Sequence, residues 1–159
     1  MGDKLLIVDG NNIAVRAWFT NLNGFFNMVQ TAINRLRPTH FVMVFDGNND
    51  SWRKRLYPGY KAGRGVDEDR RAYIKDLAKA VRAAGIETWS IGEADDIIAT
   101  LATHMASRDL HVYILSNDQD MLALPSEHIT VVSWGKQFDD FIYMDEKAVV
   151  RKLGVFPRQ

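Results

Sequence analysis

Four short runs of apolar residues constrain the fold of this chain more than any other feature of its sequence. They occupy residues 5–8, 41–45, 88–91 and 112–115. Their apolar character is continuous rather than alternating, which indicates strands that are buried on both faces, as in a parallel sheet. A weaker strand pattern follows at residues 129–133, and another, expected at a sheet edge, lies at residues 141–144.

Helical patterns separate these runs, at residues 11–19, 24–36, 67–84, 94–107 and 146–153. In the clearest of them, Asp67 is placed to cap the first turn and Gly85 is placed to end the last. Strands that alternate with helices predict an α/β fold with a mostly parallel sheet. Residues 47–66 fit no element, and a loop of that length in a compact domain usually serves a function.

The composition excludes several classes of protein. The chain has 159 residues, the size of one domain. It has no cysteine, so a disulfide framework, a zinc–thiolate site and a thiol nucleophile are excluded. No apolar run approaches the ~20 residues of a membrane span, and we expect a cytoplasmic protein without a membrane partner. Its 20 basic and 20 acidic residues balance, so net charge alone gives no indication of a nucleic-acid partner.

An acidic residue follows each of the four apolar runs. Because the carboxyl ends of parallel strands meet at one edge of an open α/β sheet, we expect these side chains to converge there. Like charges so close together repel, so some of these carboxyls would stay protonated unless a cation binds, and oxygen ligands favour Mg²⁺ or Mn²⁺ over zinc. The candidate metal ligands are Asp9, Asp46, Glu93, Asp95, Asp96, Asp118 and Asp120.

A simpler interpretation exists for each of these acids alone, because aspartate after a strand often forms a turn or caps a helix. Acids at all four strand ends together favour a metal site. Carboxylates that hold two hard cations suit phosphoryl transfer. The sequence has no Gly-rich phosphate loop, which disfavours nucleotide hydrolysis of the P-loop type. No second aspartate stands two residues after Asp9, which disfavours a phosphatase that forms an aspartyl-phosphate.

A basic stretch at residues 52–64 indicates the substrate. It contains five basic residues, no acidic residue, and three aromatic residues between them. Basic side chains neutralise phosphates, and aromatic side chains stack on bases. A solvated basic surface is the alternative, but the interleaved aromatic residues favour a nucleic-acid partner. The candidate nucleic-acid-binding residues are Arg53, Lys54, Arg55, Tyr57, Tyr60, Lys61 and Arg64, followed by Arg70 and Arg71 in the next predicted helix.

Five segments, taken together and in their order, carry a resemblance to a known family. They read Leu6-Ile7-Val8-Asp9-Gly10-Asn11, Val44-Phe45-Asp46, Trp52-Arg53 followed by Gly59-Tyr60-Lys61-Ala62-Gly63-Arg64, Glu93-Ala94-Asp95-Asp96-Ile97-Ile98-Ala99 and Ser116-Asn117-Asp118-Gln119-Asp120. The chain resembles the N-terminal nuclease domain of the 5′-nucleases. This family includes the 5′–3′ exonuclease domains of bacterial DNA polymerase I, phage exonucleases and flap endonucleases.

The resemblance implies a PIN-like, three-layer α/β fold over residues 1–159, with a basic loop or arch at about residues 47–84. It implies that the seven carboxylates bind two Mg²⁺ (or Mn²⁺) ions, directly or through water. It implies that Lys61 lies near the scissile phosphate with Tyr60 and Arg64 beside it, and that Arg53 contacts a phosphate. The residues expected to be catalytic are Lys61, Arg64, Asp118 and Asp120.

The activity that the resemblance implies is metal-dependent hydrolysis of phosphodiester bonds near the 5′ ends of DNA. The expected partner is DNA with a free 5′ end, a flap or a branch, with an RNA–DNA hybrid as a further candidate. The expected compartment is the cytoplasm of a bacterium or of a phage-infected host. A general PIN-like ribonuclease is another reading, and the motif at residues 60–64 argues against it.

Family members continue into a helix-hairpin-helix-like region that this sequence lacks. We therefore expect a truncated or split domain that relates to a C-terminal region on the same or another chain. The alternative function is a domain that binds nucleic acid and metal but needs that region for turnover.

Overall fold

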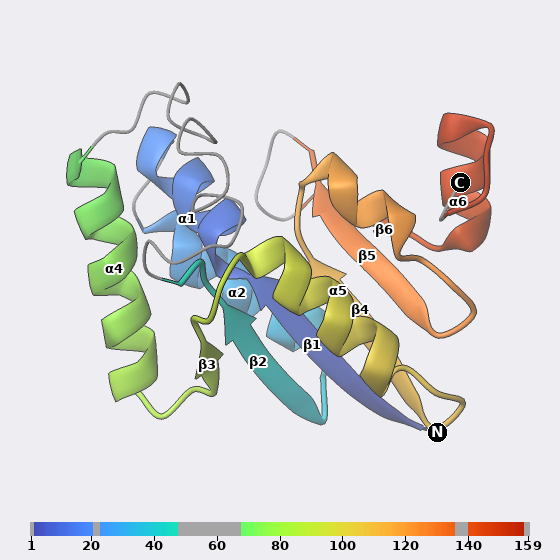
Figure 1. The fold of residues 1–159 in the computed structure, drawn as a ribbon, viewed down its shortest axis with the longest axis horizontal. Helices are drawn as coiled ribbons and strands as arrows, with labels where there is room; N and C mark the ends of the chain where they lie inside the picture. Colours follow the sequence, from blue (N-terminus) through green and yellow to red (C-terminus); the bar gives the residue numbers. More distant parts are fainter. Residues whose placement is uncertain (1, 21–22, 48–67, 136–139, 158–159) are drawn as a thin grey trace.

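A six-stranded sheet organises the part of the chain that the computed structural model describes, residues 2–20, 23–47, 68–135 and 140–157 (Figure 1). Its strand order is β3-β2-β1-β4-β5-β6. All neighbouring strands are parallel except β5 and β6, so the predicted mostly parallel sheet is confirmed. The strands are β1 (Asp3–Asp9), β2 (His40–Val44), β3 (Thr88–Trp89), β4 (Leu110–Leu115), β5 (Ile129–Trp134) and β6 (Phe141–Met144).

Helices cover both faces of this sheet, which gives three layers. On one face lie α1 (Gly10–Phe19), α2 (Gly24–Leu36) and α4 (Glu68–Ala83). On the other lie α5 (Ala94–Met105), the short 3₁₀ helix η1 (Gln119–Ala123) and α6 (Glu146–Leu153). In Figure 1, α5 crosses in front of the sheet and α2 lies behind it. None of the described helices is both long and apolar enough to cross a membrane.

The position of β1 in the middle of the sheet, with a hydrophobic core on each face, explains why its apolar run is continuous. Leu6 and Val8 belong to the core under α1, α2 and α4. Leu5 and Ile7 belong to the core under α5, η1 and α6. Successive side chains of a strand point to opposite faces, so a strand with a core on each side needs apolar residues at every position. All four side chains are buried, as the sequence predicted.

Two elements differ from their predictions. The strand expected at residues 88–91 pairs over only two residues with β2, and Ile91 is 76% exposed. Trp89 is 39% exposed because it lies on this short edge strand, whereas Trp134 in β5 is buried. The helix predicted at residues 94–107 ends at Met105, which is exposed. The buried row of α5, which packs against the sheet, is spaced by four residues, at Ala94, Ile98 and Ala102.

Candidate metal centre

Asp9 stands at the junction of β1 and α1, and its carboxylate is almost completely buried, at 2% exposure. As the N-cap of α1, it accepts a hydrogen bond of 3.2 Å at Oδ1 from the backbone N–H of Asn12. At Oδ2 it accepts one of 2.7 Å from the hydroxyl of Ser116, which follows β4. The fold therefore holds a carboxylate in a fixed orientation at the carboxyl edge of the sheet.

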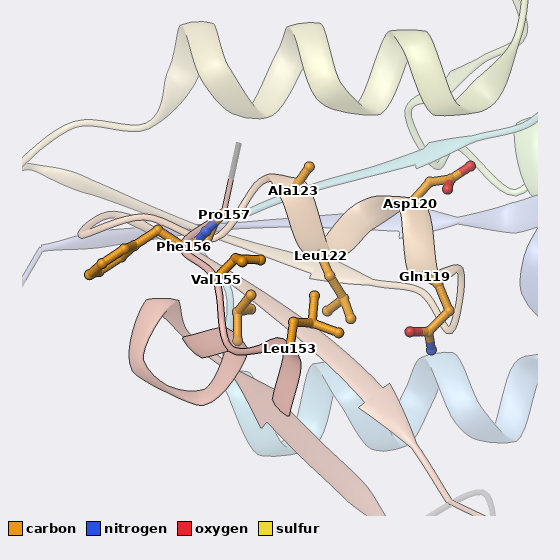
Figure 2. Close-up of a pocket in the computed structure, with 9 residues that line it drawn as sticks. Gln119, Asp120, Leu122, Ala123, Leu153, Val155, Phe156 and Pro157 are labelled. Carbon is orange, nitrogen blue, oxygen red and sulfur yellow. The ribbon is translucent and has the colours of Figure 1, made fainter. Parts of the chain in front are cut away.

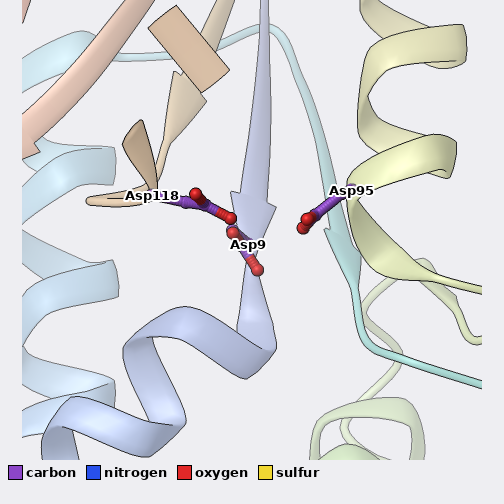
Figure 3. A group of neighbouring side chains, drawn as sticks. All are labelled: Asp9, Asp95 and Asp118. Carbon is purple, nitrogen blue, oxygen red and sulfur yellow. The ribbon is translucent and has the colours of Figure 1, made fainter. Parts of the chain in front are cut away.

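Two further carboxylates approach Asp9 from other elements, as Figure 3 shows. Asp95 lies in the first turn of α5, and Asp118 is the N-cap of η1. One carboxylate oxygen from each of the three residues lies within 4.8 Å of the others. Asp95 and Asp118 are half-buried. These three residues form the acidic triad, which three segments distant in the sequence bring together.

Burial changes the acidity of Asp9. The pKa of its carboxyl is raised from 3.8 to about 7; loss of hydration on burial is the largest cause, and the charges of Asp95 and Asp118 act in the same direction. The hydrogen bonds from Ser116 and Asn12 act in the opposite direction. Without a cation, the folded protein therefore holds Asp9 about half protonated near neutral pH.

The acidic triad fits a divalent cation. Its donors are carboxylate oxygens without a histidine or a thiol, the set that suits Mg²⁺ or Mn²⁺ better than zinc. Ionised Asp9 is costly in its buried position, and a bound divalent charge would offset that cost. Among the described residues, the acidic triad is therefore the candidate metal site.

The other four predicted ligands follow β2, β3 and β4 but lie outside this group. Asp46 is exposed, and its carboxylate accepts hydrogen bonds of 2.8 Å from the N–H of Ala94 and of 3.0 Å from the amide of Asn11. Asp96 and Asp120 are exposed, and Glu93 is the N-cap residue of α5. Neighbouring helical residues point about 100° apart, so Asp95, which joins the triad, and the exposed Asp96 point in different directions from α5. Of the seven carboxylates expected to converge, three have oxygens within 4.8 Å of one another. The role of all seven as metal ligands remains a prediction.

Comparison with known proteins identifies the family. Residues 4–154 match the family described as "5'-3' exonuclease, N-terminal resolvase-like domain". The chain belongs to this family. Its predicted resemblance to the 5′-nucleases is therefore confirmed, over nearly its whole length.

Two relatives illustrate the place of this exonuclease domain in longer proteins. DNA polymerase I of Mycobacterium tuberculosis is 35% identical over 173 aligned residues, which cover 98% of this chain and 19% of the polymerase. The flap endonuclease Xni of Shewanella baltica is 35% identical over 168 aligned residues, which cover 96% of this chain and 61% of Xni. The chain therefore spans less than two thirds of either relative.

Solved structures share the fold of this exonuclease domain. The 5′-exonuclease of bacteriophage T5, solved with bound zinc ions, has a TM-score of 0.70 and 22% identity, over 96% of this chain and 61% of that one. The catalytic core of Rad2, solved in complex with a DNA substrate, has a TM-score of 0.58 and 19% identity, over 99% of this chain and 51% of that one. These likenesses confirm the predicted PIN-like fold.

The predicted DNA-binding residues of the exonuclease domain divide into two groups. Arg70 and Arg71 lie in the first turn of α4, and the Arg70 guanidinium is 5.5 Å from the ring centroid of Phe19, which is 69% exposed. The remaining predicted contacts lie outside the described residues: Arg53, Lys54, Arg55, Tyr57, Tyr60, Lys61 and Arg64. DNA contact by both groups remains a prediction.

Three polar residues at the strand ends were missed by the sequence analysis as contributors to this site. The side chain of Asn11 accepts a hydrogen bond of 2.8 Å from the N–H of Asp46 as well as donating to its carboxylate. Asn12 accepts one of 2.8 Å at Oδ1 from the N–H of Asn117. Ser116 is the third. One sequence signal could have identified them: each is a polar residue within three positions of the end of a buried apolar strand and of a predicted metal ligand.

A separate pocket of about 230 Å³ lies between η1 and α6 (Figure 2). Its lining is mainly apolar, with Asp120 and Gln119 at one end. The residues that line it are Gln119, Asp120, Leu122, Ala123, Val149, Leu153, Val155, Phe156 and Pro157. With one ionisable side chain in its lining, it offers no converging set of catalytic groups, so we place the chemistry at the acidic triad.

Proposed function

We propose that this chain is a metal-dependent 5′-nuclease, a 5′–3′ exonuclease and structure-specific flap endonuclease that hydrolyses phosphodiester bonds near 5′ ends of DNA. The observation that carries the proposal is the acidic triad, Asp9, Asp95 and Asp118, within 4.8 Å at the carboxyl edge of the sheet. Its support is the family itself, with relatives named DNA polymerase I and flap endonuclease Xni. Such an activity belongs to DNA replication and repair, and its compartment is the cytoplasm.

The triad is the proposed centre of the metal site. Asp9, Asp95 and Asp118 would hold one Mg²⁺ or Mn²⁺ ion, and the remaining predicted ligands would complete this site or hold a second ion, directly or through water. Two bound ions would supply a nucleophilic water and stabilise the leaving oxygen. The contribution of the chain is to keep Asp9 buried and oriented by Ser116 and Asn12. The remaining ligands are Asp46, Glu93, Asp96 and Asp120.

The basic segment is the proposed DNA-binding surface. Lys61 and Arg64 would orient the scissile phosphate and offset the charge that develops on it. Arg70 and Arg71 in α4 would neutralise phosphates beside them. The proposed substrate is DNA with a free 5′ end, a flap or a branch. The Rad2 core, which has the same fold, was solved with DNA.

Cleavage of a 5′-labelled flap and of a gapped duplex, with Mg²⁺ and with EDTA, tests this function. We expect cleavage with Mg²⁺ alone, and its loss in the double variant Asp118→Asn plus Asp120→Asn. Equal rates in the double variant and the unmodified chain would overturn the metal mechanism.

A substrate panel fixes the nucleic-acid class. Branched DNA should be cleaved in preference to single-stranded RNA, with an RNA–DNA hybrid between them. Because the relatives are longer than this chain, each assay is run with and without a fragment that corresponds to the C-terminal part of Xni. Turnover only with that fragment would assign this chain the metal-holding and DNA-binding part of a two-part nuclease.

A further inference from the structure

Ser116, the residue after β4, links two members of the acidic triad. Its hydroxyl donates a hydrogen bond of 2.7 Å to Oδ2 of Asp9, 107 positions earlier in the chain. The same hydroxyl oxygen accepts a hydrogen bond of 3.2 Å from the backbone N–H of Asp118. Ser116 is 1% exposed, so water does not compete for either bond.

The surroundings of Ser116 hold this link in place. Its backbone N–H donates to the carbonyl of Val132 in β5, at 3.0 Å. The next residue, Asn117, donates its N–H to Oδ1 of Asn12, at 2.8 Å. Two hydrogen bonds to side-chain atoms therefore tie the turn after β4 to the turn after its neighbour β1. A change at this link would move Asp118 relative to Asp9.

We propose that Ser116 is a positioning residue for the metal centre, whose hydroxyl sets the orientation of the Asp9 carboxylate and the place of Asp118 toward a divalent cation. This inference rests on the proposed function, since it assigns a role with respect to the bound cation. Donation to Oδ2 by Ser116, together with donation to Oδ1 by Asn12, fixes the rotation of the carboxylate. Residues that support metal ligands in this way change metal affinity by about 10- to 100-fold when they are removed.

Thr130 offers a matched control. It is a hydroxyl residue, 8% exposed, and its Oγ1 shares a hydrogen bond of 2.8 Å with Nε2 of His111. Thr130 pairs with Tyr113 in β4, and Tyr113 pairs with Leu6 in β1, three residues before Asp9. Thr130 therefore lies about 10 Å from the level of Asp9 along the strands, and two strands away from β1. Thr130→Val therefore removes a hydroxyl of similar burial without touching the metal centre.

Calorimetric titration with Mn²⁺ tests the role of Ser116 without any activity measurement. We expect Ser116→Ala to weaken Mn²⁺ affinity by about 10- to 100-fold, and Thr130→Val to leave it unchanged. Ser116→Thr, which retains the hydroxyl, should bind within a few-fold of the unmodified chain. If Ser116→Ala does not fold, Ser116→Cys keeps the size of the side chain with a weaker donor, and should show an intermediate loss.

Two results would overturn the inference, and they are distinguishable. A folded Ser116→Ala that binds Mn²⁺ as tightly as the unmodified chain contradicts the positioning role alone. An unmodified chain that binds no Mn²⁺ contradicts the proposed function, and with it any role in positioning.

Discussion

The backbone N–H of Ala94 donates a hydrogen bond of 2.8 Å to Oδ1 of Asp46, across 48 positions of the chain. This bond ties the end of β2 to the first turn of α5, and the next residue, Asp95, is a member of the acidic triad. The other carboxylate oxygen of Asp46 accepts from Asn11, next to the start of α1. Asp46 therefore connects two of the elements that carry the triad.

Removal of the Asp46 carboxylate should cost stability even without metal. We expect Asp46→Ala to lower the free energy of unfolding in EDTA by about 1 kcal/mol, the usual cost of a lost helix cap. Asp46→Asn, which keeps an oxygen that can accept from the N–H of Ala94, should show a smaller decrease in the free energy of unfolding. Urea unfolding measures both, with Asp145→Ala as control, because Asp145 caps α6 through a bond of the same length, 2.8 Å to Ala148.

The same pair of variants reports on the triad. Loss of the Asp46 cap frees the first turn of α5, so Mn²⁺ affinity should fall in Asp46→Ala and stay unchanged in Asp145→Ala. Equal affinity in the two variants would contradict the connection between Asp46 and the site.

The metal-free protein should lose stability as pH rises, because of Asp9. The pKa of this carboxyl is raised in the folded protein to about 7 from 3.8, so between these values the folded state binds a proton that the unfolded state has lost. The stability that this proton contributes is present at low pH and disappears as pH rises through 7. Between about pH 5 and about pH 8 the loss amounts to roughly 2.5 kcal/mol.

Asp9→Asn isolates this effect, because its amide does not titrate. In EDTA, its free energy of unfolding should fall less between these two pH values than that of the unmodified chain. Asp109→Asn, at an exposed acid on the opposite edge of the sheet, should keep the slope of the unmodified chain. Identical slopes in all three proteins would show that Asp9 is not the titrating group.

Magnesium should stabilise the folded chain through the triad. An ion that binds the folded state alone adds about 2.7 kcal/mol at 100 times its Kd, and the melting temperature then rises with ion concentration. We expect Asp118→Asn to abolish most of this rise, while Asp109→Asn retains it. A Mg²⁺-dependent rise of equal size in Asp118→Asn would exclude Asp118 as a ligand.

Gly10, between Asp9 and the rest of α1, has no room for a side chain. A Cβ at this position would lie 2.6 Å from ring atoms of Phe45. Gly10→Ala should therefore lower the free energy of unfolding by about 1–3 kcal/mol, as overpacked cores do. Phe45→Leu removes the opposing ring, so the double variant should lose less than the sum of the two single losses. Additive losses would contradict the steric account.

The sequence predicted the central layers well because their signals are local. A strand with a core on both faces must be apolar throughout, and residues 5–8 are. The helix predicted at residues 24–36 has the bounds of α2. The edge was harder, because the run at residues 88–91 has only two paired positions in the sheet. An edge strand is less buried than a central strand, so its sequence need not be apolar at every position, and its length is harder to predict.

The sequence indicated which acids are candidates for the site, but not which of them the fold brings together. That acids follow the four apolar runs is visible in the sequence, but which of Asp95 and Asp96 lies closer to Asp9 depends on the rotation of α5. Ser116 could not be assigned a role, because its two hydrogen bonds depend on the neighbouring position of β1 and β4 in the sheet. Long-range side-chain bonds of this kind leave no periodic signal.

Anomalous diffraction from crystals of the chain grown with Mn²⁺ tests the central claim most directly. The account predicts a manganese peak about 2.0–2.3 Å from carboxylate oxygens of Asp9, Asp95 and Asp118, the spacing of a hard divalent cation from its oxygen ligands. The peak should disappear in Asp118→Asn. A crystal with no peak among these three carboxylates, under conditions in which the chain cleaves flap DNA, would contradict the account.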